Sequence, residues 1–542
     1  MLIQNLCNLY DQLIDPPKMG QCYGKTHYAI VLDKEGNLKQ ITDLKPFGNG
    51  YDYIQKLPWY CDVSGKLSHE YPKFLWGGFK VLKESKYFKH FKMFVEDIYS
   101  QCDDEGLKSV VNFLNNVDIN EVNSYFSNKK YLKENFVFEY NGEFVHDRQK
   151  VKNFWLEYYY ENYIKTLNKG TCLLSGNYDY IVKKHGPTIS YGNGVRLASF
   201  NDQVYNYLGK SKGNIAPCGA TFVHKYSIAL EWLNVNRQYV NVGDNKLYFW
   251  TDTRPELGKE LVSIFGMYLD NEQEQDEEEI RKTKEIINYV KRGNDVSNLQ
   301  LPDTNVNILT TKFKLGRISV LGYQRESLEK IYKNVLQHYK DTYVGQEKLN
   351  TTNINNIVKN TLTEDQRNRK DWYEKISRFL VERLFYSMLN NKKYPNELYN
   401  QIMLRIRAET GTLNETRVGF LNGYYKRRGE CMNEYYELGK LFKLLENLQR
   451  AATGGELSTR FFASAMATPR NIFPELLKRG DYHIEKMKKG EKVGLAIWYN
   501  NKITEVCDNL GDDFPKRIPQ SEQGKFVLGY RKTMKDKEEE NE

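Results

Sequence analysis

The sequence predicts an α+β protein: a mixed N-terminal region with short strands and helices, followed by a mainly helical region ending in a small C-terminal helical bundle. Two patterns support this prediction. Up to Thr251, short apolar runs bounded by turn residues alternate with helix-like apolar spacing. From about Leu328 to the end, almost every segment has helical spacing. A chain of 542 residues is also long enough for several domains.

The N-terminal region opens with a predicted β-hairpin. Thr26–Leu32 reads THYAIVL, an apolar run typical of a buried strand, and residues 33–37 (DKEGN) form a turn before LKQI returns. Helix-like apolar spacing follows at Ser85–Tyr99, at Val151–Leu167 and at Ala220–Trp232. We therefore expect strands and helices to alternate here.

Three more strands are expected around an acidic run. The strand patterns lie at Leu247–Thr251 (LYFWT), at Val306–Thr311 and at Arg317–Tyr323. Between them, Asp270–Glu279 reads DNEQEQDEEE and contains no aromatic residue. Because its like charges repel one another, this run predicts a solvated surface loop rather than part of a core.

The C-terminal segment has the pattern of a helical bundle. Leu441, Leu444, Leu445 and Leu448 fall at i, i+3, i+4 and i+7, which places them on one face of a helix. Further apolar-periodic stretches, separated by short breakers, follow at Phe461–Met466, Ile472–Leu477, Val493–Val506 and Phe526–Tyr530. Short helices joined in this way are typical of a small bundle.

These patterns divide the chain into four predicted parts. They are a mixed α/β domain over residues 1–269, an acidic loop over 270–287, a mixed and then helical middle region over 288–430, and a helical bundle over 431–542.

Composition limits the function classes. Lysine and arginine number 79 against 70 acidic residues, and this net charge of +9 permits a polyanionic partner without requiring one. The chain has no apolar run of about 20 residues, and its N-terminus, MLIQNLCNLYDQL, does not resemble a signal peptide. The eight cysteines form no C-x-x-C pair. We expect a cytoplasmic protein with reduced thiols and no membrane partner.

Motifs for catalysis are weak. Gly24-Lys25-Thr26 supplies the tail of a phosphate-binding loop, but Met19 stands where the first glycine is needed. Gly209-Lys210-Ser211 fails in the same way, with Val204 in that position. His146-Asp147 is an adjacent pair of the kind found in metal-dependent phosphohydrolases, although the simpler interpretation is a solvated turn after NGEF. No catalytic residue, metal site or cofactor is predicted.

Candidate nucleic-acid contacts lie on two glycine-containing segments. Residues 191–196 (YGNGVR) form a loop in which Asn193 and Arg196 could bond bases or phosphates. Trp76-Gly77-Gly78 is interpreted as a second turn, with an aromatic side chain and flanking lysines. An ordinary turn between two strands is the plainer interpretation of residues 191–196, and lysines on surface loops are usually only solvated. The full set of DNA-binding candidates is Lys73, Lys80, Lys183, Lys184, Asn193, Arg196, Lys210 and Lys212.

Several of these motifs together resemble the large subunit of type I-C CRISPR interference (Cascade) complexes. The similar segments stand in family order over nearly the whole chain. They are DPPKMGQCYGKTHYAIVLDKEGNLKQI (15–41), TCLLSG (171–176), GNGVRLASFN (192–201), FKLGRISVLGY (313–323), YPNELYNQIMLRIRAE (394–409), LGKLFKLLENLQ (438–449), RFFASAMATPRNIFPELL (460–477) and SEQGKFVLGYRK (521–532). The chain departs from the family at the acidic run and at the glycine loop.

The resemblance implies a non-catalytic subunit of a crRNA-guided complex. Such a subunit recognises the protospacer-adjacent motif in duplex DNA with its N-terminal domain and helps to open the duplex. Its implied partners are target double-stranded DNA, the crRNA 5′ end region, the backbone subunits, the subunit at the crRNA 5′ handle, the small subunits and a helicase-nuclease recruited after target binding. Two alternatives stay open: a metal-dependent nuclease using His146 and Asp147, and a structural spacer without DNA contacts.

The resemblance also implies that the C-terminal bundle is made separately as a small subunit from an internal start. Met432 is the predicted start, because it lies just before the first bundle helix. Met403 falls inside the preceding helical pattern, and Met466 would discard the first bundle helix. Codons for Arg428-Gly429-Glu430 can form a purine-rich ribosome-binding run. An ordinary helix-to-helix turn at this point is the alternative.

Overall fold

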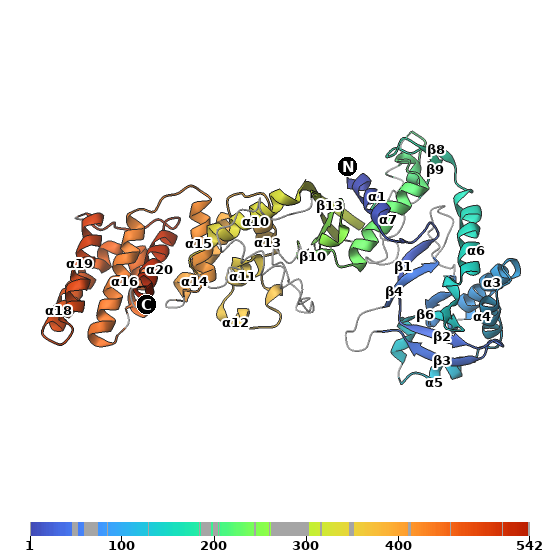
Figure 1. The fold of residues 1–542 in the computed structure, drawn as a ribbon, viewed down its shortest axis with the longest axis horizontal. Helices are drawn as coiled ribbons and strands as arrows, with labels where there is room; N and C mark the ends of the chain where they lie inside the picture. The colour runs from blue at the N-terminus through green and yellow to red at the C-terminus, as the bar shows by residue number, and fades with distance from the viewer. Residues whose placement is uncertain are drawn as a thin grey trace. The chain divides into compact units, whose positions relative to one another are not determined.

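The computed structural model divides the chain into two compact units. One unit comprises Met1–Tyr239, Asp244–Gly258 and Val306–Arg325, and the other comprises Val240–Gly243, Lys259–Asn305 and Glu326–Glu542 (Figure 1). The residues that the structure describes are 2–45, 53–58, 74–83, 85–127, 129–183, 185, 197–198, 204, 206, 208–242, 245–258, 261, 303–314, 317–345, 352–409, 413–455, 457–511 and 513–539. The acidic run over 270–287 therefore lies outside the described residues.

The predicted hairpin forms the edge of a five-stranded sheet. β2 (Tyr28–Leu32) and β3 (Leu38–Asp43) are antiparallel, with Ile30 opposite Ile41. β2 also pairs in parallel with β6 (Asn135–Tyr140), and the sheet order is β3-β2-β6-β5, with β7 (Glu143–Phe144) added beside β6. At the turn, Gly36 has a φ of +88°, and an added Cβ would lie 2.5 Å from the Asn112 side chain. A glycine is thus required by both backbone conformation and packing.

The predicted strand over Thr26–Leu32 is divided between two sheets. Thr26 ends β1 (Gln21–Thr26), which pairs with β4 (Tyr53–Pro58), and β2 begins only at Tyr28. His27 lies between them: its backbone N–H donates to the Asn135 carbonyl at 2.9 Å, and its Nδ1 accepts from the Asn135 N–H at 2.9 Å. These two bonds hold the chain where it passes from one sheet to the other.

Helices cover this sheet and bury an aromatic core. α3 (Ser85–Gln101) confirms the predicted helix, and it is followed by α4 (Glu105–Asn116). Phe91 of α3 stacks on Phe138 of β6. The predicted helix over Val151–Leu167 is α6 (Gln149–Tyr159), which continues as a π-helical turn over Tyr160–Ile164. Its Trp155 stacks on Phe74 at 4.9 Å and donates to the Gly20 carbonyl.

A long buried helix and a second sheet complete the first half of the chain. α7 (Ala220–Val235) packs against α1 (Leu2–Gln12). The helix α7 is predicted from the sequence, whereas α1 is not. The other sheet has the order β10 (Tyr239–Val242), β11 (Asn245–Thr251), β12 (Asn305–Lys314) and β13 (Arg317–Ser327). β11 and β12 are antiparallel, with Phe249 opposite Ile308. The three strands predicted here are confirmed, and all are longer than expected.

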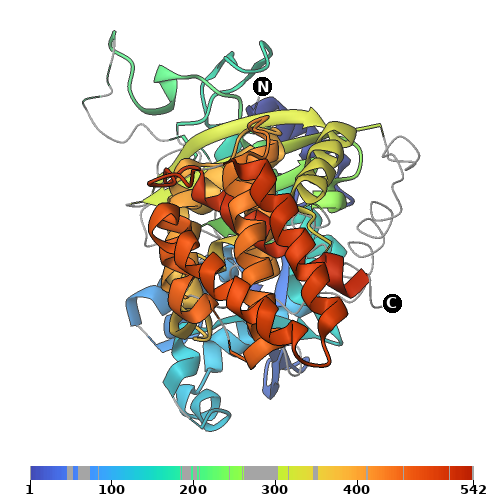
Figure 2. The same cartoon turned by 90° about the vertical axis from the view of Figure 1, so that its left-hand side faces the viewer.

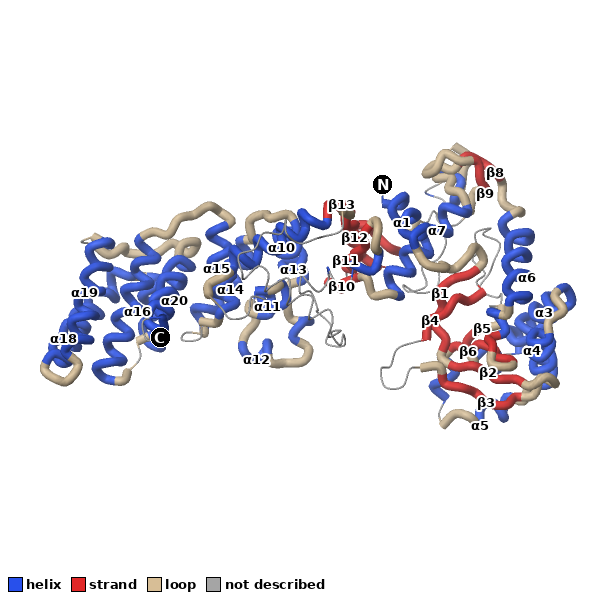
Figure 3. The backbone as a smooth tube through the Cα atoms, viewed as in Figure 1, coloured by secondary structure: helices blue, strands red, loops and turns tan. Residues whose placement is uncertain are grey.

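After β13 the described chain is helical (Figure 3), as predicted. The first group contains α10 (Leu328–Thr342), α11 (Ile354–Lys359), α12 (Glu364–Arg367), α13 (Arg378–Leu389), α14 (Asn396–Ala408) and α15 (Glu415–Lys426). Figure 2 looks onto the helices that follow, drawn in orange to red. These are α16 (Glu434–Thr453), α17 (Ser458–Ala467), α18 (Pro469–Lys488), α19 (Val493–Leu510) and α20 (Gln523–Glu539), and α16 packs against each of the other four. The predicted fold class is confirmed.

A buried ionic group joins α16 to α20. Lys443 Nζ lies 2.6 Å from Glu446 Oε2, and the Tyr530 hydroxyl donates to the same oxygen at 2.7 Å. The Lys443 and Glu446 side chains are almost completely buried. Because a buried charge is costly unless a partner of opposite charge and hydrogen bonds stabilise it, the Lys443 ammonium and the Glu446 carboxylate depend on each other, and the Tyr530 hydroxyl adds a hydrogen bond to the carboxylate. They also fix the register of α16 against α20.

We predict that Glu446→Ala lowers the free energy of unfolding by about 3–5 kcal/mol, because it leaves the Lys443 ammonium buried without its counter-ion. The double variant Lys443→Met/Glu446→Leu should be less destabilised than the single variant, since it removes both charges. Denaturant unfolding of the full chain measures both. Glu505→Ala, which breaks the exposed Lys502–Glu505 pair at the same i, i+3 spacing, is the control and should cost less than about 1 kcal/mol. Equal losses for Glu446→Ala and Glu505→Ala would contradict this account.

Candidate nucleic-acid interface

The structure describes half of the predicted DNA contacts. Lys80, Lys183, Lys210 and the backbone of Lys212 are described, whereas Lys73, Lys184, Asn193 and Arg196 lie outside the described residues. Lys80 is exposed and begins the short helix α2 (Lys80–Lys83) directly after β5. Lys210 is also exposed. These two lysines are placed where they could meet a phosphate backbone.

The segment before Lys80 is not the turn that the sequence suggested. Trp76–Gly78 is β5, an antiparallel strand in which Trp76 lies opposite Val137. The Trp76 ring is buried, and its Nε1 donates to the Pro58 carbonyl at 2.7 Å. The interpretation of this segment as a turn is therefore wrong: Trp76–Gly78 is a strand, and the Trp76 ring belongs to the core, where it is not available for stacking on a base.

The two ends of the 183–212 stretch lie close together in space. Gly213 N–H donates to the Lys183 carbonyl at 3.0 Å, and Val182 N–H donates to the Cys218 carbonyl at 3.0 Å. A Cβ on Gly213 would lie 2.0 Å from the Val182 carbonyl oxygen, so only glycine permits this approach. Lys183 is consequently close in space to the chain near Lys210 and Lys212, which the sequence places far apart.

His185, a further basic residue in this segment, is buried. Its Nδ1 lies within hydrogen-bonding distance of the Tyr226 hydroxyl, and its side chain is 3% exposed. Burial of this ring removes it from any surface that could meet DNA. Tyr226 lies on α7, so His185 anchors the segment to that helix instead.

The His146–Asp147 pair is also not a solvated turn. His146 follows β7, its ring stacks on Phe144, and its side chain is 2% exposed. Burial lowers the pKa of His146 to about 4, although Asp147 acts against this shift. Within the described ranges, no group of three or more His, Cys, Asp or Glu side chains could hold a metal ion. Among the residues that the structure describes, His146 has no such group of partners, which the nuclease alternative requires.

Met432 lies on an exposed linker between α15 and α16. Its side chain is 39% exposed. The next residue, Asn433, caps α16 by accepting from the Tyr435 N–H at 3.2 Å, and it donates to Glu522 at 3.0 Å. The helix that begins after Met432 thus carries its own N-cap.

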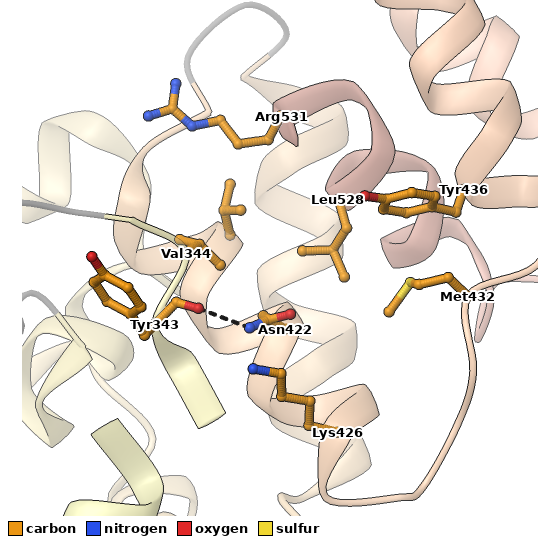
Figure 4. A pocket seen from close by; sticks show the side chains of 9 residues that line it. Tyr343, Val344, Asn422, Lys426, Met432, Tyr436, Leu528 and Arg531 are labelled. Carbon is orange, nitrogen blue, oxygen red and sulfur yellow. Dashed lines mark hydrogen bonds between the residues drawn. The ribbon is translucent and has the colours of Figure 1, made fainter. Parts of the chain in front are cut away.

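A pocket of about 360 Å³ lies beside this linker. Figure 4 shows Met432, Tyr436 and Leu528 on its bundle side, with Tyr343 and Val344 opposite. The other lining residues are Val418, Asn422, Lys426 and Arg531. Asn422 Nδ2 donates to the Tyr343 carbonyl at 3.0 Å, and the cationic side chains of Lys426 and Arg531 also line the pocket. The pocket marks an incompletely filled contact between α15 and the helices that follow.

Comparison with known proteins identifies one family. A model described as CRISPR-associated protein (Cas_Csd1) matches residues 6–536. No curated protein matches the chain. None of the helices in the described ranges combines the length and the apolar character needed to cross a bilayer.

The buried state of His146 predicts a pH dependence of stability. The native pKa of about 4 lies below the ordinary value of 6.5, so the unfolded chain binds the extra proton first and stability falls as the pH drops through that interval. This loss amounts to about 3 kcal/mol of the free energy of unfolding at and below pH 4. We expect His146→Leu to remove this acid-dependent loss. Unfolding curves of both proteins between pH 7 and pH 4 measure the difference. Loss of Mn²⁺ binding in the variant would instead support a metal site.

Proposed function

Because the chain belongs to the Cas_Csd1 family, the large subunit of type I-C Cascade, we propose that it recognises the protospacer-adjacent motif in duplex DNA and helps to open the duplex. The observation that carries this proposal is the family match over residues 6–536. In this role the crRNA reads the target by base pairing, and the protein reads only the short adjacent motif, as in other RNA-guided effectors.

The lysines of the first unit support a DNA-contacting role. Lys183 and Lys210 lie near the two ends of the 183–212 stretch, which the Gly213–Lys183 hydrogen bond brings together. Lys80 stands exposed at the end of β5. We assign these three side chains to phosphate contacts, which position a protein on a duplex, and Asn193 and Arg196 to base contacts, which specify sequence. A structural spacer would need none of them.

The proposed subunit performs no chemistry itself. After target binding it supports recruitment of a helicase-nuclease, and it contacts the crRNA 5′ end region, the subunit at the crRNA 5′ handle, the backbone subunits and the small subunits. The competing nuclease would use His146 and Asp147. His146 is buried, and the described part of the chain offers no group of His, Cys, Asp or Glu side chains that could hold a metal ion, which argues against that role.

We further propose that residues 432–542 are also produced alone, as a small subunit that starts at Met432. Three features favour this start. The linker at Met432 is exposed, α16 has its own cap in Asn433, and α16 packs against all four later helices. Separation here would uncover Tyr436 and Leu528, which line the pocket beside α15 (Figure 4). These side chains would then be available to another subunit.

We predict that Lys183→Ala and Lys210→Ala each reduce the salt dependence of target binding by the assembled complex. Losing one phosphate contact should lower the slope of log affinity against log salt by about 0.9. Asn193→Ala or Arg196→Ala should instead cost about 1–3 kcal/mol and relax motif choice. Titrations with duplexes carrying correct and altered motifs measure both quantities. The control is Lys502→Ala, an exposed lysine of α19. If Asn193→Ala and Arg196→Ala change neither affinity nor motif preference, residues 191–196 do not read DNA.

We predict that expression of the gene with a C-terminal tag yields a second, smaller product beginning at Met432. Synonymous recoding of Arg428–Glu430 should reduce this product without altering the full chain, because only the ribosome-binding run is changed. Mass spectrometry of the product reads its N-terminus. An unchanged band after recoding, or a different first residue, would contradict this start.

A further inference from the structure

A cluster of three arginines and one glutamate lies among the helices of the unit that contains Glu326–Glu542. Arg367 is the last residue of α12, Arg417 lies in the first turn of α15, and Glu409 caps the end of α14. Glu409 Oε2 accepts from Arg367 Nη2 at 3.0 Å and forms an ion pair with Arg417 Nη1 at 2.8 Å. Two guanidinium groups therefore share one carboxylate oxygen. The third arginine, Arg405, lies one helical turn before Glu409, whose backbone N–H donates to the Arg405 carbonyl at 2.9 Å.

The positive charges of this arginine cluster exceed its negative charge. Glu409 pairs with both Arg367 and Arg417, so one carboxylate serves two cations. Arg405 adds a third positive charge, and no carboxylate of the described residues forms an ion pair with it. Its Nε is buried and has no hydrogen-bond acceptor within the described ranges. A charge taken out of water without a counter-ion is costly, so the cluster as it stands favours a further anion.

The burial of Arg417 makes this excess of charge expensive. Its side chain is 0% exposed, and its Nε donates to the Asn360 carbonyl at 3.3 Å. Its Nη2 is also buried, yet this atom meets no hydrogen-bond acceptor in the part of the chain that the structure describes. A buried donor without a partner costs about 1–3 kcal/mol, and more when it is charged. The Arg367 and Glu409 side chains are each 16% exposed, so the cluster reaches solvent and an anion can enter it.

Two asparagines hold the guanidinium groups in place. Asn360 Oδ1 accepts from Arg367 Nη1 at 3.2 Å and from Asn414 Nδ2 at 2.5 Å. Asn414 also caps α15, because its Oδ1 accepts from the Arg417 backbone N–H at 2.9 Å. The side chains are thus ordered before any ligand binds, which lowers the entropy cost of binding.

The electrostatics of the cluster agree with its geometry. Burial works to raise the pKa of Glu409, but the hydrogen bond and charge of Arg417 and the charge of Arg367 outweigh it and lower that pKa, so Glu409 stays ionised. Burial lowers the pKa of Arg417, and the positive charges of Arg367 and Arg405 act in the same direction. Because arginine keeps its proton in proteins, this repulsion between cations remains until an anion relieves it.

We propose that Arg367, Arg405 and Arg417 form a binding site for a phosphate group. A guanidinium presents a planar fork of N–H donors that matches phosphate oxygens, and charge-assisted hydrogen bonds of this kind are the strong ones. A phosphate seated beside Arg405 Nε and Arg417 Nη2 supplies both the acceptors and the negative charge that the cluster lacks. The lysines proposed above to contact DNA belong to the other unit, so this site does not depend on the proposed function.

The first test measures thermal unfolding of the full-length chain in sodium phosphate, with sodium chloride and sodium acetate at the same ionic strength as references. The unfolding midpoint should rise by about 2–4 °C once phosphate is roughly tenfold above its dissociation constant. Arg405→Gln should lose most of this rise. Arg369→Gln, which removes an exposed guanidinium paired with Asp371, should keep it. This control accounts for the general stabilisation that phosphate gives to folded proteins.

A variant of the glutamate should act in the opposite direction. Glu409→Gln removes the carboxylate that shares the guanidinium groups of Arg367 and Arg417. The variant should be less stable in chloride, and phosphate should raise its unfolding midpoint by more than it raises that of the unmodified chain. A smaller rise in Glu409→Gln than in the unmodified chain would contradict a site built on these charges.

A second test distinguishes the source of the phosphate. If the site holds a phosphate of the nucleic-acid backbone, Arg405→Gln in the assembled complex should lower the slope of log affinity against log salt for target binding by about 0.9. If the site holds free phosphate, the slope stays the same and only the thermal effect is lost. The proposal is overturned if Arg405→Gln changes neither the slope nor the phosphate-induced rise. An equal rise with acetate that Arg405→Gln removes would also overturn it, in favour of an acidic side chain of a partner protein.

Discussion

The hydroxyl groups of Tyr399 and Tyr425 hold the start of the last helix, α20, and so join the C-terminal bundle to α14 and α15. They lie 3.0 Å apart; Tyr399 accepts from the Gly524 N–H at 3.1 Å, and Tyr425 donates to the Ser521 carbonyl at 2.7 Å. The first N–H groups of a helix have no partner within it. Burial raises the pKa of Tyr399 to about 12 and also raises that of Tyr425, so both remain protonated donors.

The nature of these contacts is consistent with a bundle that is also proposed to exist alone. The hydrogen bonds of Tyr399 and Tyr425 with the start of α20, and the pocket beside Met432, are partly polar contacts between the bundle and the preceding helices. The ionic group of Lys443, Glu446 and Tyr530, in contrast, lies wholly within α16 and α20. Losing α14 and α15 would therefore remove contacts to the bundle without opening its own core. In the division of labour that we propose, Lys80, Lys183 and Lys210 contact DNA and the bundle contacts other subunits.

Periodic apolar patterns were enough to predict the fold class, the hairpin, α3, α7 and every helix of the bundle. Predictions from these patterns were wrong where contacts with the rest of the fold override the local sequence preference. Trp76-Gly77-Gly78 has turn-like composition, but tertiary pairing with β6 makes it a strand. His146 follows a polar turn yet is buried. The approach of Lys183 to Gly213 depends on a contact between residues distant in sequence, which no spacing rule reveals. Asn193 and Arg196 lie outside the described residues and stay predictions.

The most direct test of the central claim compares Cascade assembled with and without this chain. Binding is measured for a duplex target with the correct adjacent motif, for one with an altered motif, and for the same target as a single strand. The account predicts that omitting the chain abolishes the motif preference and weakens duplex binding, while pairing of the crRNA with the single strand persists. Motif-dependent duplex binding that survives without the chain would contradict it.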